Sequence, residues 1–244
     1  MLLLAALLSL LIGAVLGMLG GGGAILMLPM LVYVTQVEPK SAIAMSLFVI
    51  GSTSLVGMSV HARAGNVRWK IGGIFGAAAM AGAFGGGRLA HFVPAGALLV
   101  TFGVVMLVTA TAMLRGRAAG AQAVRRLAVG RAVALGAGVG VLSGLVGAGG
   151  GFLIVPALTL FGGLAMHEAI ATSLFVIALQ SFAGFAGHAA HVELDWTLVT
   201  VASGAAAVGG VLGSFAGKRV SPDHLRRAFA YLVVAMGLFV ISKQ

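Results

Sequence analysis

The sequence repeats itself, and this duplication is the strongest constraint on the fold of the chain. The block AIAMSLFVI at 42–50 returns as AIATSLFVI at 169–177, a shift of 127 positions, and no gap is needed across the surrounding region. The matched pairs in this register are Gly13 and Gly140, Gly17 and Gly144, Gly20 and Gly147, Gly22 and Gly149, Gly23 and Gly150, Pro29 and Pro156, His61 and His188, and Trp69 and Trp196. We therefore expect two similar halves, a construction that is common in membrane transporters.

Both halves are too apolar for a soluble domain. Hydrophobic residues make up 60% of the chain and charged residues 8%, whereas soluble domains carry about 25% charged residues. Several apolar stretches reach the roughly 20 residues that cross a bilayer. We predict an all-α polytopic membrane protein with two inverted-topology repeats, each a broken or re-entrant glycine-rich segment plus three transmembrane helices. The first repeat covers 1–114, a basic linker 115–130, and the second repeat 131–244.

Each half contains the same predicted segments. The broken segments are 2–35 and 131–162, and the spans lie near 41–60, 70–90 and 95–114, then 168–188, 196–216 and 228–242. The first apolar segment is similar to the core of a signal peptide, but it lacks a basic start. Its counterpart near 128–146 lies inside the chain, so we expect the first segment to be retained.

Basic residues indicate the orientation in the membrane. The linker region carries Arg115, Arg117, Arg125, Arg126 and Arg131, which predicts a cytoplasmic linker. If each broken segment returns to its own side, the second half is inverted, the basic cluster at 217–227 is also cytoplasmic, and both termini are external. An odd number of crossings would put that cluster outside, so the inverted arrangement is favoured. The net charge of +10 is explained in this way without a nucleic-acid partner.

The glycine runs interrupt helices at membrane depth. Gly20–Gly23 is followed by an apolar segment, 24–35, which is about 18 Å long as a helix, too short for the roughly 30 Å of hydrocarbon. Irregular backbone is tolerated there only in protein or beside a cavity, and a helix beginning after the glycines would direct free N–H groups at an anion. Close helix packing is the alternative; we favour it for the Gly13/Gly17 and Gly140/Gly144 pairs.

Polar residues after each break complete the candidate site. Their hydroxyl and amide groups could donate hydrogen bonds to an anion, or could bond to their own helix. His61 and His188 are candidate proton relays, or else interfacial polar residues. The candidate substrate-binding residues are Gly20, Gly21, Gly22, Gly23, Gly147, Gly149, Gly150, Gly151, Ser46, Thr53, Thr172, Ser173 and Gln180.

The acidic residues, the cysteine count, the histidines and Ser143 indicate which solutes, metal sites and reactions to expect. All five acidic residues fall in or beside predicted loops, which favours an anion or a neutral solute over a cation. No cysteine is present, so thiolate chemistry is excluded. His188 and His191 have no close third ligand, so we expect no metal, and we expect no cofactor. An enzyme would need a nucleophile such as Ser143 beside a base, but the repeat mate of Ser143 is Leu16, and we expect no catalysis.

The duplicated glycine-rich segments closing in Pro29 and Pro156, the duplicated A-x-S-L-F-V-I block and the chain length together resemble the TauE/SafE family of sulfite exporters. The resemblance implies a secondary transporter in the cytoplasmic membrane that moves sulfite, sulfoacetate or a related organosulfonate by alternating access. The anion would bind at the glycine-rich half-helix N-termini between the repeats, with protons or another ion as coupling partners. A passive anion channel and an intramembrane enzyme are the alternatives, and the direction of transport stays open.

Overall fold

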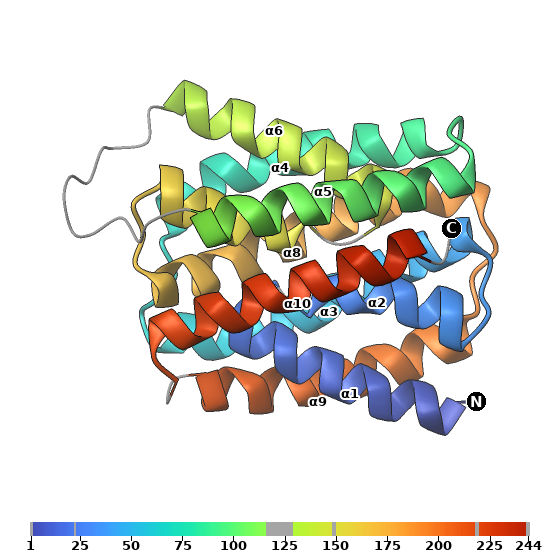
Figure 1. Ribbon diagram of the computed structural model, residues 1–244, viewed down its shortest axis with the longest axis horizontal. Coiled ribbons are helices and arrows are strands. Elements are labelled where there is room, and N and C mark those ends of the chain that lie inside the picture. The colour runs from blue at the N-terminus through green and yellow to red at the C-terminus, as the bar shows by residue number, and fades with distance from the viewer. Residues whose placement is uncertain (1, 22, 116–128, 148–149, 218–219, 243–244) are drawn as a thin grey trace.

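The computed structural model describes residues 2–21, 23–115, 129–147, 150–217 and 220–242, and these residues form helices and connecting loops without a strand (Figure 1). The helices of the first half are α1 (Leu2–Leu19), α2 (Ala24–Pro29), the π-helix η1 (Met30–Val34), α3 (Pro39–Arg63), α4 (Trp69–Ala90) and α5 (Ala95–Arg115). Those of the second half are α6 (Val129–Val146), α7 (Gly151–Pro156), the π-helix η2 (Ala157–Phe161), α8 (Met166–His188), the short η3 (Ala189–His191), α9 (Trp196–Gly217) and α10 (Pro222–Ser242).

The predicted helical membrane architecture is confirmed. Each expected span is a helix, although α10 begins at Pro222 rather than near 228, because proline suits the first turn of a helix. Most of the predicted linker, 116–128, lies outside the described residues. Among the described residues, the helices long and apolar enough to cross a membrane are Leu2–Leu19, Pro39–Arg63, Met166–His191 and Trp196–Gly217, and the shorter apolar helices are Ala24–Val34, Ala95–Val108 and Gly130–Val146.

Both predicted breaks are present. The first helix ends at Gly20, whose φ of +64° is left-handed and suits glycine, and the Gly20 N–H donates to the Leu16 carbonyl over 2.8 Å. Gly147 repeats this geometry with a φ of +74° and a 2.9 Å hydrogen bond to the Ser143 carbonyl. The chain then turns back, since a Cβ added to Gly23 would lie 2.3 Å from the carbonyl oxygen of Ile12 in α1.

Each half-helix ends in a proline followed by a π-helical turn. Proline has no N–H to donate to the carbonyl four residues earlier, and directly after Pro29 and Pro156 the hydrogen bonds reach one residue further. The Thr35 N–H donates to the Met30 carbonyl over 3.2 Å, and the Gly162 N–H donates to the Ala157 carbonyl over 3.1 Å. Such π-turns occur frequently at functional sites, and here both halves carry one in the same register.

The two halves interlock instead of packing as separate domains. Helix α1 packs along α9, and its repeat mate α6 packs along α4 (Figure 1). An added Cβ at Gly13 would lie 2.0 Å from the Ala206 carbonyl oxygen, and one at Gly140 would lie 2.2 Å from that of Ala79. The packing interpretation of the two GxxxG pairs is therefore confirmed. Further contacts between the halves pair α3 with α8 and α9, α4 with α8, and α5 with α10.

Repeat mates run in opposite directions in Figure 1. Helix α5 ends at the left, where the linker begins, whereas its mate α10 ends at the right beside the C-terminus. Helix α1 starts at the right beside the N-terminus, whereas its mate α6 starts at the left. The assignment of these two ends to membrane sides stays a prediction.

Candidate functional site

We define the two glycine loops by their described glycines, which are Gly20, Gly21 and Gly23 in the first half and Gly147, Gly150 and Gly151 in the second, and all of these are buried in the interior of the bundle. A Cβ added to Gly21 would lie 2.6 Å from the Cα of Gly151, and one added to Gly151 would lie 2.5 Å from the Cα of Gly21. Gly21 also has a φ of +138°, which other residues rarely adopt. Only glycine allows two main chains to approach this closely, so the loops contact one another backbone to backbone.

Two buried serines hold the loops from opposite halves. The Ser46 hydroxyl of α3 donates to the Gly147 carbonyl over 2.6 Å, and the Ser173 hydroxyl of α8 donates to the Gly20 carbonyl. Both serine side chains are fully buried. We call these two crossed hydrogen bonds the serine clasp. Each serine thus fixes the loop of the half to which it does not belong.

The isoleucines of the duplicated block press on the same loops. A Cβ on Gly20 would lie 2.6 Å from the Cα of Ile170, and one on Gly147 would lie 2.8 Å from the Cα of Ile43. The hydroxyls of Ser46 and Ser173 also lie within 2.8 Å of the carbonyl oxygens of these isoleucines. The duplicated block therefore has a structural purpose: it supplies the walls that hold each glycine loop in place.

The second loop has a more polar environment than the first. The Gln180 side-chain nitrogen donates to the Ser143 hydroxyl over 3.3 Å, and a Cβ on Gly150 would lie 2.5 Å from the same nitrogen. Gly150 has a φ of +61°, so it also requires glycine. The residues that correspond to Ser143 and Gln180 in the first half are Leu16 and Thr53. Sequence reasoning considered Ser143 only as a nucleophile and missed it as a residue of this site.

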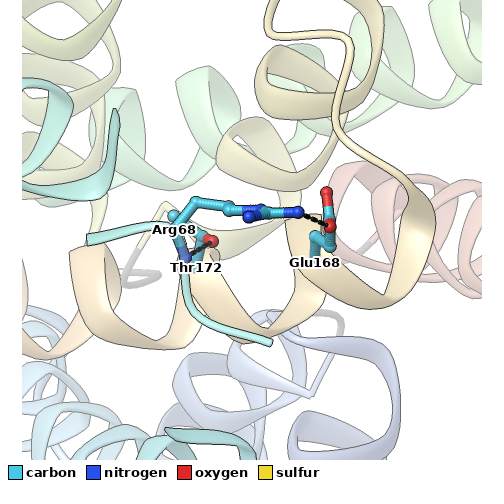
Figure 2. Close-up of polar contacts among 3 residues, drawn as sticks. All are labelled: Arg68, Glu168 and Thr172. Atoms are coloured by element: carbon cyan, nitrogen blue, oxygen red, sulfur yellow. Dashed lines mark hydrogen bonds and ion pairs between the residues drawn. The ribbon is translucent and has the colours of Figure 1, made fainter. Parts of the chain in front are cut away.

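Two predicted residues lie away from the loops. The Thr53 hydroxyl donates to the Val49 carbonyl of its own helix over 2.8 Å. The Thr172 hydroxyl accepts a hydrogen bond from the Arg68 backbone N–H over 3.0 Å at the end of the bundle (Figure 2). The described hydrogen bonds and close contacts therefore join the glycines to Ser46, Ser173 and Gln180, whereas the hydroxyls of these threonines bond elsewhere. Gly22 and Gly149 lie outside the described residues.

The two candidate relay histidines lie far apart from one another. His61 is buried at the end of α3 and His188 at the end of α8, and these helices end at opposite ends of the bundle (Figure 1). The nearest polar contact of His188 joins its Nδ1 to the Gly184 carbonyl over 3.1 Å. The two histidines therefore cannot form one relay by direct contact.

An ion pair between the halves lies at one end of the bundle. Figure 2 shows the Arg68 guanidinium directed at the Glu168 carboxylate of α8. The hydrogen bond and negative charge of Glu168 raise the pKa of Arg68. Because the Arg68 side chain is 55% exposed, solvent screens the pair, and its contribution to stability is small. The two residues are 100 positions apart, so no local sequence pattern predicts that they pair.

The opposite end, where α3 and α9 begin, carries a pocket instead of an ion pair. Its volume is about 340 Å³, and its polar lining comes from Glu38, Ser41, Glu193 and Asp195. Glu38 and Asp195 accept backbone N–H groups of the first turns of α3 and α9, as helix-capping residues do. One end is thus tied by opposite charges, whereas this pocket at the other end is lined by acidic residues.

The two halves interlock, and their broken helices meet inside the bundle. This architecture defines the class of the protein, which is that of the multi-pass α-helical membrane proteins of transporter type. The family model described as "Sulfite exporter TauE/SafE" matches residues 5–240. The chain belongs to the TauE/SafE family, and it is a membrane transporter.

Relatives from distant organisms extend over almost the whole chain. A probable membrane transporter protein of Xylella fastidiosa is 34% identical over 95% of this chain and 91% of the relative. Probable membrane transporter proteins of Bacillus subtilis and Methanocaldococcus jannaschii are 29% and 28% identical, over 95% and 96% of this chain and 96% and 94% of the relatives. No solved structure matches the chain.

Proposed function

We propose that the chain is a secondary transporter that moves a small sulfur-containing anion, such as sulfite, sulfoacetate or a related organosulfonate, across the cytoplasmic membrane. The observation that carries this proposal is the backbone contact between the two glycine loops in the interior of the bundle, at Gly21 and Gly151. The glycines leave the main chain of both loops without side chains, so a ligand that separates the loops would meet peptide groups from both halves.

The polarity of the interior favours an anion. The continuous helical segments Ala24–Val34 and Gly151–Phe161 begin at the two loops, and helix N-termini carry partial positive charge. When the serine clasp opens, the hydroxyls of Ser46 and Ser173 become donors for sulfonate or sulfite oxygens, together with the Gln180 amide. The buried polar residues of the described chain are serines, threonines, histidines and a glutamine, without a carboxylate among them.

We further propose alternating access about the repeat interface. In this arrangement the serine clasp holds each loop against the opposite half, the Arg68–Glu168 pair closes the end where α4 begins, and the pocket beside Glu193 marks the end that opens first. Opening the closed end breaks the ion pair. In the membrane, the 115–130 linker is cytoplasmic, both termini are external, and the closed end is the cytoplasmic one.

Transport by the protein in liposomes tests this proposal. Uptake of labelled sulfite, sulfate, sulfoacetate and an amino acid is measured with and without a pH gradient. We expect accumulation of a sulfur-containing anion, loss of that uptake in Gly21→Ala and Gly151→Ala, and full uptake in Gly138→Ala, because an added Cβ at Gly138 meets open space. A folded protein that takes up no sulfur anion contradicts the proposal. Uptake that stops when the anion concentrations inside and outside the vesicles are equal, with or without a pH gradient, indicates a channel.

A further inference from the structure

A small cavity lies where α4 and α8 end and where α3 and α5 begin. Its volume is about 10 Å³, which is room for one water and too little for a sulfur oxyanion. Its lining contains four basic residues: Lys40 of α3, His91 directly after α4, His188 of α8 and His191 of η3. The cavity is partly enclosed by Gly87 and Leu98.

His188 presents an unpaired nitrogen in this region. Its side chain is only 5% exposed, and its Nδ1 lies 3.1 Å from the Gly184 carbonyl oxygen. A carbonyl can only accept, so Nδ1 carries the hydrogen and the neutral ring keeps a lone pair on Nε2. Nε2 is buried without a hydrogen-bond partner among the described residues. A buried acceptor left without a partner is costly, so this atom requires an explanation.

The ring position is built into the packing. A Cβ added to Gly87 would lie 2.9 Å from the His188 Nδ1 and 2.8 Å from the Gly184 carbonyl oxygen. The glycine therefore leaves the space in which the imidazole and its hydrogen bond fit. A histidine that only faced the membrane interface would need no such space in a neighbouring helix.

The groups that face this cavity are cationic or neutral. The Lys40 ammonium donates to the His91 carbonyl over 3.0 Å, and the rings of His91 and His191 lie with their centroids 4.6 Å apart and their planes tilted by 37°. None of the lining residues is a carboxylate. A proton placed on His188 would therefore have no counter-ion in the cavity, and a negative charge arriving elsewhere in the bundle would stabilise it.

We propose that the cavity holds one water and that His188 Nε2 is a proton-binding site loaded through that water from this end of the bundle. The proton moves from hydronium in the cavity to the Nε2 lone pair, which leaves neutral water behind. This inference deepens the proposed function, on which its coupling step rests, by making the proton the coupling ion.

The proposed coupling between the bound anion and the proton on His188 runs along one face of α8. Gln180, Gly184 and His188 are spaced at i, i+4 and i+8 and so share that face, and eight residues of helix span about 12 Å. Gln180 lies against the second glycine loop. An anion bound at the loops supplies the missing counter-charge and so raises the affinity of His188 for the proton. By linkage, a proton on His188 raises the affinity of the loops for the anion by the same factor.

Solid-state NMR in lipid bilayers tests the site without any transport. His188 is the only one of the six histidines that follows a glycine, so labelling glycine carbonyls with ¹³C and histidines with ¹⁵N identifies its signal in the unmodified protein. We expect the neutral ring to carry hydrogen on Nδ1, to contact water, and to take up a proton reversibly as the pH is lowered. A neutral ring whose hydrogen lies on Nε2 instead of Nδ1, a ring without water contact, or a ring that stays neutral throughout the titration overturns the proposal.

Proton flux in liposomes tests the coupling. With a pH-sensitive dye inside the vesicles, an imposed gradient of sulfite or sulfoacetate is expected to drive proton movement in the unmodified protein and in His167→Gln, but not in His188→Gln. Anion transport without proton movement in the unmodified protein overturns the proton proposal and leaves the proposed function standing. Absence of all sulfur-anion transport refutes the proposed function, whereas the NMR result still decides whether His188 binds a proton.

Discussion

The serine clasp predicts a crossed effect of mutation. In Ser173→Ala, a residue of the second half is changed, but the hydrogen bond that disappears belongs to the Gly20 carbonyl in the first half. In Ser46→Ala, the Gly147 carbonyl in the second half loses its donor. A buried acceptor without its donor costs about 1 to 3 kcal/mol, which raises the population of the opened loop about 5- to 150-fold. The serine proton is shared with Ile43 or Ile170, so we expect the lower half of that range.

Hydrogen exchange of backbone amides, read by mass spectrometry, measures loop opening directly. We expect Ser173→Ala to accelerate exchange around Gly20 and Ser46→Ala to accelerate exchange around Gly147, each with little effect on the other loop. Ser52→Ala is the matched control, since this serine of α3 bonds only to the Phe48 carbonyl of its own helix among its described contacts. The reasoning is refuted if each mutation loosens the loop of its own half, or if neither exceeds the control.

Further predictions concern packing and the ion pair. Gly140→Ala is expected to destabilise the fold by about 1 to 3 kcal/mol in reversible unfolding in detergent, because its Cβ would lie 2.2 Å from a carbonyl oxygen of α4, whereas Gly138→Ala in the same helix meets open space and is expected to be neutral or slightly stabilising; equal effects would contradict the packing. A double-mutant cycle with Arg68→Gln and Glu168→Gln is expected to give a weak coupling that falls as salt is added, and a coupling that salt leaves unchanged would mean that the pair is less solvated than its exposure indicates. Thr53→Val is expected to leave anion uptake unchanged, because its hydroxyl serves its own helix; a loss of uptake would return Thr53 to the substrate site.

Much of this arrangement could be predicted from the sequence because a small number of physical rules govern helices in a membrane. Long apolar stretches must be helical in lipid, and glycine runs placed at equal positions in both halves predict equal breaks. The GxxxG pairs also predicted close packing, although the partner helices, α9 for Gly13 and α4 for Gly140, could not be read from the chain. Packing partners depend on how two halves assemble, which no local pattern records.

The breaks at the glycine loops could be predicted from the sequence, and the contacts of the polar side chains around them only in part. Ser46 and Thr172 belong to neighbouring positions of the duplicated block, yet Ser46 reaches a glycine loop and Thr172 reaches Arg68 at the end of the bundle. One residue along a helix turns a side chain by about 100°, which decides whether a hydroxyl faces the loops. Ser143 was undervalued because its repeat mate is leucine, although the departure from symmetry is what makes the second loop polar.

The central claim is that both glycine loops bind one anion together, and ligand-dependent hydrogen exchange tests it most directly. Sulfite and sulfoacetate are titrated onto the protein in nanodiscs while exchange is followed around Gly20 and Gly147. The account predicts that one of these anions slows exchange at both loops with the same half-saturating concentration, and that Gly151→Ala removes the protection from both. Protection of one loop alone, or protection confined to exposed basic loops, would contradict a shared site.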